Sequence, residues 1–384
     1  MVSTPIRVLI IDDSAMFRRL LALGIKSDPE FELVGAAANA EQARQFIRIR
    51  RPDVISLDLE MPQMDGLTFL KEEISKDPIP TVVVSSTTAS GIRVTIDALQ
   101  AGAVDVLPKP RMTAGDDMLT ATSQIRMRLK AARAAHVNKE RPRADRRPAA
   151  MATAAAPAPM PRAAVPSVAS NPEYGRWLFA IGASTGGVQA LGTLIEQLPA
   201  DAPGTVIVQH MPSGFTNAFA RRLNEQCAIE VREAQHGDVI KQGVVLLAPG
   251  GDRHMVLQPM PGGHRVVLHE GAPVCYSRPA VDVLFASVAN YAAPRVTAAL
   301  LTGMGRDGAQ GLNMIRRVGG RTFAQDEASS VVFGMPAAAW EIGGAEGLVP
   351  IHKMAQTMLD SVGMPPAPIP ETNVFSTPLR KGTY

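Results

Sequence analysis

Five short apolar runs, separated by amphipathic stretches, occupy the first third of the chain. Each run is short enough for a buried strand, and the stretches between them, such as Met16–Ile25 and Ala40–Ile49, carry apolar residues at helical spacing. Strands that alternate with helices in this way form a parallel sheet covered by helices on both faces. We therefore predict a doubly wound α/β domain over residues 1–128. Its predicted strands are Arg7–Ile11, Glu32–Ala37, Val54–Leu57, Thr81–Val84 and Val104–Leu107.

Polar residues stand where these predicted strands end. Asp12 and Asp13 end the first strand, Asp58 ends the third, Ser85 ends the fourth, and Lys109 follows the fifth. The carboxyl ends of parallel strands share one edge of the sheet, so these groups should meet there. Converging carboxylates repel one another, and Mg²⁺ would relieve that repulsion with the oxygen ligands it prefers. A helix-capping or surface role explains any one of these residues, but not the ordered set.

The ordered set resembles the receiver domain of response regulators. The motifs that carry the resemblance are Asp12-Asp13, Asp58 with Met61-Pro62 and Asp65-Gly66 behind it, Ser85, and Lys109-Pro110. The resemblance implies a flavodoxin-like fold with a phosphoacceptor (Asp58), Mg²⁺ ligands (Asp12, Asp13 and Asp58) and residues that read the phosphorylated state (Ser85 and Lys109). Many receivers carry an aromatic switch residue three positions before the lysine. This chain has Val106 there, so aromatic gating is not implied.

Residues 129–175 have a different composition. Fifteen alanines and seven prolines lie between positions 131 and 172, with seven Lys/Arg against two Asp/Glu. Prolines interrupt helices and no apolar periodicity remains to build a core, so we predict a flexible linker. The net charge of the whole chain is only +3. The basic character therefore belongs to this linker rather than to a folded nucleic-acid-binding face. Residues 364–384, where prolines recur, are predicted to form a loose tail.

Strand-like and helix-like patterns return over residues 176–363 and predict a second doubly wound α/β domain. Within it, the stretch Ile181–Gly187 places Ser184 on a glycine-rich turn between an apolar strand and a helix. The free N–H groups and positive dipole end of that helix suit a site where negative charge develops. Ser184 is therefore a candidate nucleophile. The predicted strands are Leu178–Ile181, Val206–Val208, Val244–Ala248, Val266–Leu268, Val296–Leu301 and Gly347–Pro350.

A serine nucleophile needs a base within hydrogen-bond reach and an acid that orients that base. His210 is the leading base because it directly follows an apolar strand, Val206–Gln209. Asp307 is the leading acid because it lies on a glycine-rich turn, which again follows a strand. Other histidines lie in predicted turns or near a predicted hairpin and are weaker candidates: His236, His254, His264 and His269.

Five motifs in this half of the chain resemble the catalytic domain of chemotaxis protein-glutamate methylesterases, the CheB family. They are Ile181–Gly187, Val208–Pro212, Ala248–Gly250, Ser277–Phe285 and Leu301–Ala309. The resemblance implies a catalytic triad of Ser184, His210 and Asp307, with Thr185 and Met304 beside it as candidate backbone oxyanion donors. It also implies hydrolysis of glutamate methyl esters and deamidation of glutamines on chemoreceptors. A chemotaxis histidine kinase is the implied phosphodonor.

The pairing of a receiver with an esterase suggests how the activity is controlled. We expect the unphosphorylated receiver to pack over the Ser184 site and exclude the substrate. Phosphorylation of Asp58 would weaken that interface. A coupling free energy of about 1–3 kcal/mol would raise the activity by a factor of about 5 to 150.

Two other function classes stay open at this stage. The stretch Gly182–Gly187 is also a possible phosphate cradle of a nucleotide-binding domain, although it lacks the Gly-x-Gly-x-x-Gly spacing and the P-loop lysine. Alternatively, the second domain is a receptor-docking module without turnover. The literal Gly-x-Ser-x-Gly match does not indicate an α/β-hydrolase, because the chain order here is Ser, His, Asp rather than Ser, Asp, His.

The composition and the absence of certain motifs limit which cofactors and which cellular compartment we expect. Two cysteines are too few for a disulfide framework and fit a reducing compartment. The N-terminus carries no signal-peptide pattern, so we expect a cytoplasmic protein without membrane insertion. No His-Glu-x-x-His or paired Cys-x-x-Cys motif is present, and we expect no cofactor in the second domain.

Overall fold

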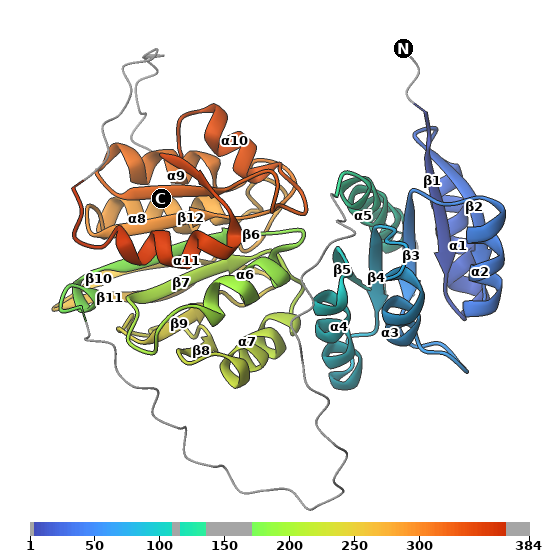
Figure 1. Ribbon diagram of the computed structural model, residues 1–384, viewed down its shortest axis with the longest axis horizontal. Coiled ribbons are helices and arrows are strands. Elements are labelled where there is room, and N and C mark those ends of the chain that lie inside the picture. Colours follow the sequence, from blue (N-terminus) through green and yellow to red (C-terminus); the bar gives the residue numbers. More distant parts are fainter. Residues whose placement is uncertain (1–3, 110–115, 136–170, 366–384) are drawn as a thin grey trace, which may run out of the picture.

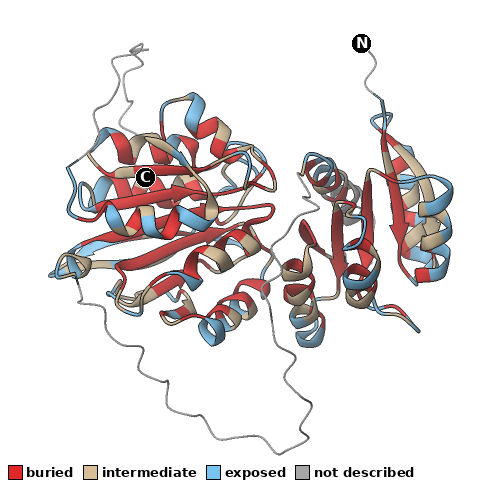
Figure 2. Ribbon diagram, in the orientation of Figure 1, coloured by how far each residue is buried: buried red, intermediate tan, exposed pale blue. Residues whose placement is uncertain are grey.

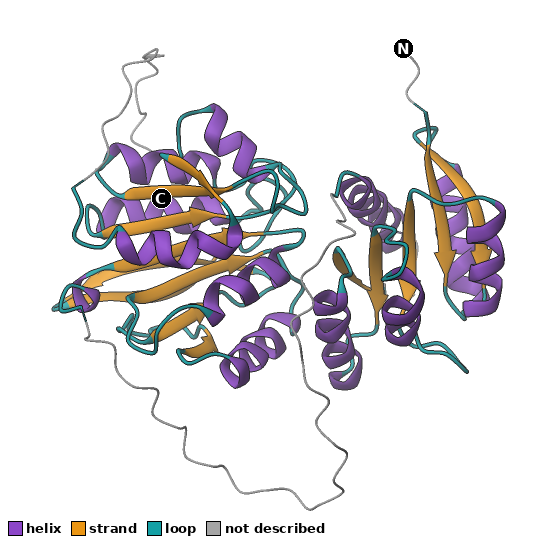
Figure 3. Cartoon of the chain, viewed as in Figure 1, coloured by secondary structure: helices purple, strands orange, loops and turns teal. Residues whose placement is uncertain are grey.

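The computed structural model describes residues 4–109, 116–135 and 171–365, which form two α/β domains (Figure 1, Figure 3). Most of the predicted linker, residues 136–170, and the predicted tail from residue 366 onward lie outside the described residues. No helix in the described ranges combines the length and the apolar character that crossing a membrane requires.

The first domain is built on a five-stranded sheet in the order β2-β1-β3-β4-β5, with every pairing parallel. This arrangement confirms the doubly wound fold predicted from the sequence, and each strand lies within one residue of its predicted bounds. The elements are β1 (Ile6–Ile11), α1 (Ala15–Lys26), β2 (Phe31–Ala37), α2 (Ala40–Ile49), β3 (Val54–Asp58), α3 (Gly66–Phe69) with a π-helical turn after it (Leu70–Ile74), β4 (Thr81–Ser85), α4 (Ala89–Ala101), β5 (Asp105–Pro108) and α5 (Asp116–Arg133).

Helix α5 extends beyond residue 128, the domain boundary predicted from the sequence. Leu129 and Ala132 are buried in its last two turns, in the same cluster as Phe17 and Leu21 of α1. Burial of these apolar side chains holds the end of α5 against α1, so the first domain reaches at least to Arg133.

The second domain is built on a seven-stranded parallel sheet in the order β14-β13-β12-β6-β7-β9-β8, with a separate antiparallel pair, β10 and β11. The elements are a 3₁₀ turn (Tyr174–Arg176), β6 (Leu178–Ala183), α6 (Gly187–Glu196), β7 (Gly204–Gln209), α7 (Phe215–Gln226), β8 (Glu230–Glu233), β9 (Val244–Leu247), β10 (Arg253–Met260), β11 (Gly263–Glu270), α8 (Val281–Tyr291), β12 (Val296–Leu300), α9 (Ala309–Arg317), β13 (Arg321–Gln325), α10 (Met335–Glu341), β14 (Gly347–Val349) and α11 (Ile351–Asp360). The sequence predicted this parallel fold but not strands β8, β10 and β13.

Alternate residues of β6 face opposite layers of the second domain. Phe179 and Ile181 belong to the hydrophobic cluster that contains α6, α7 and α11, whereas Leu178 and Ala180 belong to the cluster that contains α8, α9 and α10. Strands buried on both faces read as continuous apolar runs, and for this reason β6 was recognisable in the sequence. Figure 2 shows the central strands of both sheets buried between helices with exposed outer faces, whereas edge strands such as β2 are only partly buried.

The two domains pack against each other through α4 of the first and α6 and α7 of the second (Figure 1). Leu99 and Val106 of the first domain share one hydrophobic cluster with Val188 of α6. The side-chain amide of Gln189 donates to the carbonyl of Leu99 at 2.6 Å. The N–H of Gly186 donates to the carbonyl of Val104 at 3.1 Å. The glycine-rich turn after β6 therefore lies at the domain interface.

Candidate active site and phosphorylation site

Ser184 lies between the last residue of β6 and the first residue of α6. Its N–H donates to the carbonyl of Thr302 at 3.0 Å, which ties this turn to the segment after β12. Gly186 adopts a φ of 79°, a conformation that glycine reaches without steric cost. A Cβ on Gly303 would lie 2.7 Å from the Cβ of Ser184, so only glycine permits this approach of the two loops. The candidate nucleophile is thus held between two glycine-containing segments.

The structure brings the side chains of Ser184, His210 and Asp307 together. Nδ1 of His210 lies 3.1 Å from Oγ of Ser184, and Nε2 lies 2.8 Å from Oδ2 of Asp307. The imidazole is only 8% exposed and the carboxylate 3%. The three residues follow β6, β7 and β12, which are neighbours in the sheet with β6 in the middle. Residues far apart in the chain meet here because they occupy the carboxyl ends of adjacent parallel strands.

Asp307 is held as a hydrogen-bond acceptor by the N-terminus of α8. Its Oδ2 accepts the N–H of Val281 at 2.7 Å, and its Oδ1 accepts the N–H of Asp282 at 2.9 Å. Free N–H groups and the dipole at a helix N-terminus favour a negative charge. An ionised carboxylate can only accept hydrogen bonds. A neutral His210 therefore carries its proton on Nε2, which donates to Asp307, and the lone pair of Nδ1 faces Ser184. This geometry is that of a general base beside a nucleophile.

Two backbone N–H groups next to Ser184 remain available to a substrate. Across the described part of the chain, no hydrogen bond uses the N–H of Thr185 or of Met304. Thr185 is buried, whereas Met304 is 41% exposed. Unpaired N–H groups near a nucleophile can stabilise the oxyanion of a tetrahedral intermediate. The two residues predicted as oxyanion donors therefore retain the hydrogens that this role needs.

The same turn is poorly suited to cradle a phosphate group. The N–H of Ser184 is bonded to Thr302, that of Gly186 to Val104, and that of Gly187 to the carbonyl of Ser184 at 2.7 Å. A phosphate cradle requires several backbone N–H groups that point at the ligand. Most of those groups are already used here, which disfavours the nucleotide-binding alternative.

Ser277, which was not among the predicted site residues, lies beside the imidazole of His210. Its Oγ is 3.2 Å from Nδ1 of His210, the same nitrogen that faces Ser184. Ser277 opens one of the motifs of the CheB resemblance, but its position just before Arg278-Pro279 gives no sign of a contact with a histidine 67 positions earlier. The contact exists only because the fold brings this turn over the end of β7.

The first domain contributes a carboxylate to the turn that carries Ser184. Oδ2 of Asp105 accepts a hydrogen bond from the hydroxyl of Thr185 at 2.9 Å and another from Nη1 of Arg128 at 2.7 Å. Asp105 and Thr185 are buried, and Ser184 is 7% exposed. This contact crosses the domain interface and fixes the residue next to the candidate nucleophile.

A small pocket at the interface is lined by both domains. Val104 and Val106 line it from the first domain, and Ser184, His210 and Met211 line it from the second. The first domain therefore covers one side of the candidate active site.

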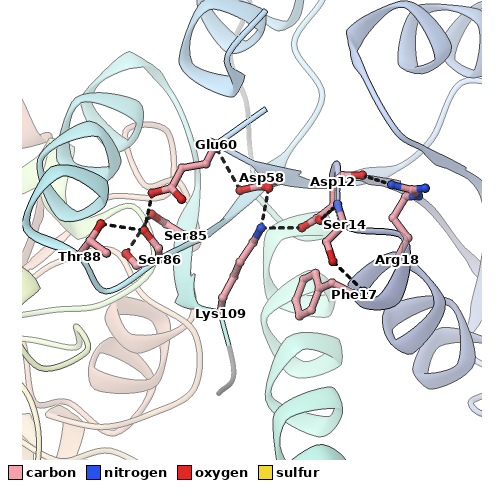
Figure 4. Close-up of polar contacts among 10 residues, drawn as sticks. All are labelled: Asp12, Ser14, Phe17, Arg18, Asp58, Glu60, Ser85, Ser86, Thr88 and Lys109. Carbon is pink, nitrogen blue, oxygen red and sulfur yellow. Dashed lines mark hydrogen bonds and ion pairs between the residues drawn. The ribbon is translucent and has the colours of Figure 1, made fainter. Parts of the chain in front are cut away.

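A second polar cluster lies at the carboxyl ends of β1, β3 and β5 in the first domain (Figure 4). The carboxylates of Asp12, Asp13 and Asp58 each offer an oxygen within 4.8 Å of the others. Nζ of Lys109 lies 2.6 Å from Oδ2 of Asp58 and 3.2 Å from Oδ2 of Asp12. Apart from this ion pair with Lys109, that buried oxygen of Asp12 has no hydrogen-bond partner in the described ranges. The cluster thus offers oxygen ligands of the kind that Mg²⁺ prefers.

Burial controls the electrostatics of this cluster. It raises the pKa of Asp58 to about 6, although the hydrogen bond from Lys109 opposes the shift. Burial also raises the pKa of Asp12. The pKa of Lys109 is lowered by burial, but its contacts with Asp58 and Asp12 outweigh that effect and raise the pKa above its ordinary value. Burial raises both carboxyl pKa values, and the charge of a bound cation would oppose that effect.

The two predicted switch residues lie differently in the structure. Lys109 contacts the predicted phosphoacceptor, Asp58. The hydroxyl of Ser85 instead donates to the carbonyl of Gly91 in α4 at 3.3 Å. Ser85 therefore connects the end of β4 to α4, the helix that packs on the second domain.

The other candidate histidines make contacts elsewhere. Each hydrogen-bonds a backbone carbonyl, and none contacts Ser184: His236 to Leu268, His254 to Ala272, His264 to Tyr291 and His269 to Glu270. His254 is buried, and burial lowers the pKa of its imidazole. These contacts are structural and leave His210 as the base candidate.

Comparison with protein families finds two domain models. The model described as CheB methylesterase matches residues 179–358, and the model described as response regulator receiver domain matches residues 8–133. The two matches cover the described parts of both domains almost completely.

Curated relatives match along nearly the whole chain. The protein-glutamate methylesterase/protein-glutamine glutaminase of group 2 operon from Cereibacter sphaeroides is 50% identical over 353 residues, 92% of this chain and 91% of that protein. The protein-glutamate methylesterase/protein-glutamine glutaminase 2 of Pseudomonas aeruginosa is 45% identical over 92% of this chain and 96% of its own length. The crystal structure of the CheB methylesterase catalytic domain from Thermotoga maritima is 36% identical and covers 48% of this chain and 98% of its own, with a TM-score of 0.47.

Proposed function

The chain belongs to the CheB methylesterase family, and we propose that it hydrolyses glutamate methyl esters on chemoreceptors and deamidates receptor glutamines by the same route. It is an enzyme of chemotaxis adaptation, and its receiver domain places that activity under the control of phosphorylation. The observation that best supports the proposed site is that His210 contacts both other members of the triad. Its Nδ1 lies 3.1 Å from Oγ of Ser184 and its Nε2 lies 2.8 Å from Oδ2 of Asp307.

The first half of the reaction forms an acyl-enzyme. Oγ of Ser184 attacks the carbonyl carbon of the ester while Nδ1 of His210 takes the serine proton. The N–H groups of Thr185 and Met304 stabilise the oxyanion, and one such donor is typically worth about 3 kcal/mol. The tetrahedral intermediate then expels methoxide, which takes the proton from Nδ1 and leaves as methanol. Asp307 keeps the imidazole oriented and stabilises its charged form.

The second half hydrolyses the acyl-enzyme. A water molecule gives a proton to Nδ1 of His210 as its oxygen attacks the acyl carbon. The intermediate collapses, the proton passes from Nδ1 to Oγ of Ser184, and the glutamate side chain is released. With a glutamine substrate, ammonia leaves in place of methanol in the first half. These steps use only side chains, backbone N–H groups and water, so we propose no cofactor in the catalytic domain.

The receiver inhibits the esterase by covering the active site, and strand β5 links the two sites. Asp105, its first residue, bonds Thr185 across the interface. Lys109, the residue directly after β5, bonds Asp58. Phosphorylation of Asp58 replaces the carboxylate that Lys109 contacts with a larger and more negatively charged acyl phosphate, so a shift of this lysine toward the phosphoryl oxygens would be transmitted along four residues to Asp105. Loss of the Asp105–Thr185 contact then opens the site to the receptor.

Phosphorylation of the receiver requires a cation. Asp12, Asp13 and Asp58 would hold Mg²⁺, and the mutual approach of their carboxylate oxygens to within 4.8 Å fits that assignment. When bound there, the cation would supply positive charge that stabilises the transferred phosphoryl group. A chemotaxis histidine kinase is the proposed phosphodonor, chemoreceptors are the substrate, and the cytoplasm is the proposed compartment.

Release of labelled methanol from methylated receptor membranes tests this function. The wild-type chain should release methanol, and Ser184→Ala should abolish release while leaving the thermal transition in place. A receptor-docking module without turnover would release no methanol in either case. Calorimetry measures whether the second domain binds a nucleotide. Binding would favour the nucleotide-binding alternative over the esterase.

A further inference from the structure

We propose that Ser277 is a positioning residue for the second half of the reaction, in which it holds His210 after Ser184 has been acylated. This inference rests on the proposed esterase function and assigns a role to a residue that the catalytic triad does not include.

Two hydroxyl groups compete for one nitrogen of the imidazole. Oγ of Ser184 lies 3.1 Å from Nδ1 of His210, and Oγ of Ser277 lies 3.2 Å from the same atom. With Nε2 committed to Asp307, a neutral imidazole offers a single lone pair at Nδ1. Only one of the two hydroxyls can donate a well-directed hydrogen bond to it at a time. In the resting enzyme that partner must be Ser184 for attack to begin.

The requirement changes once Ser184 is acylated. Its oxygen then carries the acyl group and has no hydrogen to donate, so Nδ1 of His210 loses that partner. Across the described residues, the only side-chain hydrogen bond of Ser277 is the one to this nitrogen. Its hydroxyl is thus free to donate to Nδ1 and to keep the imidazole in the plane that its bond to Asp307 defines. When the hydrolytic water takes the place at Nδ1, one of its hydrogens points to that nitrogen and the other can be accepted by Oγ of Ser277, so the contribution of Ser277 persists in the second transition state. Ser277 neither gains nor loses a proton over the cycle, because the proton that Nδ1 takes from the water passes to Ser184.

The backbone around Ser277 is built to fix this position. Val274 and Ser277 exchange two backbone hydrogen bonds, at 3.1 and 2.9 Å, across a two-residue turn. The two central residues, Cys275 and Tyr276, have φ values of 49° and 63°. Non-glycine residues rarely adopt such angles, and a tight turn of this kind normally uses Asn and Gly. Two unfavourable residues in succession persist only where the surrounding structure determines the turn, and such strain concentrates at functional sites.

The same turn argues against Ser277 as the nucleophile. The N–H of Ser277 is used within the turn, whereas the unpaired N–H of Thr185 directly follows Ser184. A nucleophile needs free donors beside the carbonyl that it attacks. Ser184 has such a donor in the N–H of Thr185. We therefore place Ser277 in a role that it performs through its contact with His210.

The test compares variants that differ in one hydroxyl group. The full-length enzyme, treated with acetyl phosphate and Mg²⁺, is mixed with a synthetic peptide that bears a glutamate γ-methyl ester. Rapid-quench sampling separates the first turnover of methanol, which reports acylation, from steady-state release, which reports the complete cycle. Intact mass spectrometry measures the peptide–enzyme adduct.

Ser277→Ala should keep the first turnover and lower steady-state release about fivefold to tenfold, as loss of one ordinary hydrogen bond implies. The adduct should accumulate and map to Ser184. Ser277→Thr and Ser277→Val have the same shape and differ in the hydroxyl, so Thr should restore release to within about twofold and Val should behave like Ala. Tyr276→Asn, on the same turn, should leave both phases unchanged.

The inference is overturned if Ser277→Ala leaves both phases unchanged, or if it lowers the first turnover and the steady state by the same factor, since that pattern indicates a structural role. It is also overturned if Thr and Val behave alike, or if the adduct maps to Ser277. Absence of methanol release from the wild type would overturn the proposed esterase function and this inference with it.

Discussion

The carboxylate of Asp105 in the receiver accepts a hydrogen bond of 2.9 Å from the hydroxyl of Thr185 in the catalytic domain. Thr185 directly follows Ser184, and Asp105 begins the strand that ends just before Lys109. The first residue of β5, Asp105, therefore contacts the catalytic turn, whereas the residue after its other end, Lys109, contacts the phosphoacceptor Asp58. This relationship gives phosphorylation a short physical route to the esterase.

Asp105→Ala should raise the esterase activity of the unphosphorylated enzyme about fivefold, because loss of a hydrogen bond to a buried partner is worth about 1 kcal/mol. Activity after treatment with acetyl phosphate should not change. Methanol release with and without the phosphodonor measures both quantities. Asp53→Ala is the matched control, because Asp53 pairs with Arg7 within the receiver. Equal basal activity of wild type and Asp105→Ala would contradict the assignment.

A charge swap tests the outer part of the interface. Nη1 of Arg222 lies 2.9 Å from Oδ1 of Asp97, and both side chains are about one-third exposed. Arg222→Asp should place like charges together and raise basal methanol release about twofold to fivefold, whereas Asp97→Arg combined with Arg222→Asp should restore it. A double variant that stays as active as the single one would show that this pair does not hold the domains together.

Asp307→Asn should lower the turnover number by about 10³–10⁴ with little change in KM. The amide can donate to Nε2 of His210, which favours the tautomer with the proton on Nδ1 and removes the acceptor that Ser184 needs. Steady-state methanol release measures the loss. Asp282→Asn is the control, since its side chain bonds Gly311 at the start of α9 rather than His210. A loss of less than tenfold in Asp307→Asn would remove Asp307 from the proposed triad.

The stability of the catalytic domain should depend on pH through Asp282. Burial, together with the nearby charge of Asp307, raises the pKa of Asp282 to about 6, well above the ordinary range of an aspartate. A carboxyl group with a raised folded-state pKa binds its proton more tightly when folded. Its contribution to stability is therefore complete below the unfolded pKa and is lost as pH rises through about 6.

Denaturant titration of wild type and Asp282→Asn at pH 4.5 and 7.5 measures this contribution. Relative to the variant, the wild type should lose about 1 kcal/mol of unfolding free energy between the two pH values, a figure reduced for the partial exposure of the side chain. Asparagine retains the acceptor for the N–H of Gly311. A constant difference between the two proteins at both pH values would contradict the shift.

Residues that follow buried parallel strands were predictable from the sequence. Asp58, Ser184 and His210 each stand directly at the end of an apolar run, and strands buried on both faces give the clearest signal. The strands that were missed lack that signal. For example, β8 is an edge strand of sequence Glu-Val-Arg-Glu, in which a single apolar residue faces the core.

Contacts between distant segments were not predictable in the same way. Asp105 reads as an ordinary polar residue at the start of a strand, and its role depends on the packing of two domains that the sequence describes separately. Ser277 lies in a turn, and no periodicity relates a turn to the strand end that it covers. The sequence shows where the linker between the two domains lies, but it does not show which surfaces of the two domains pack together.

The most direct test of the account is methanol release from methylated receptor membranes by wild type, Ser184→Ala and Asp58→Asn, each with and without acetyl phosphate. We expect the phosphodonor to stimulate the wild type, Asp58→Asn to keep basal release without stimulation, and Ser184→Ala to release nothing in either condition. Equal stimulation of wild type and Asp58→Asn, or release by Ser184→Ala, would contradict it.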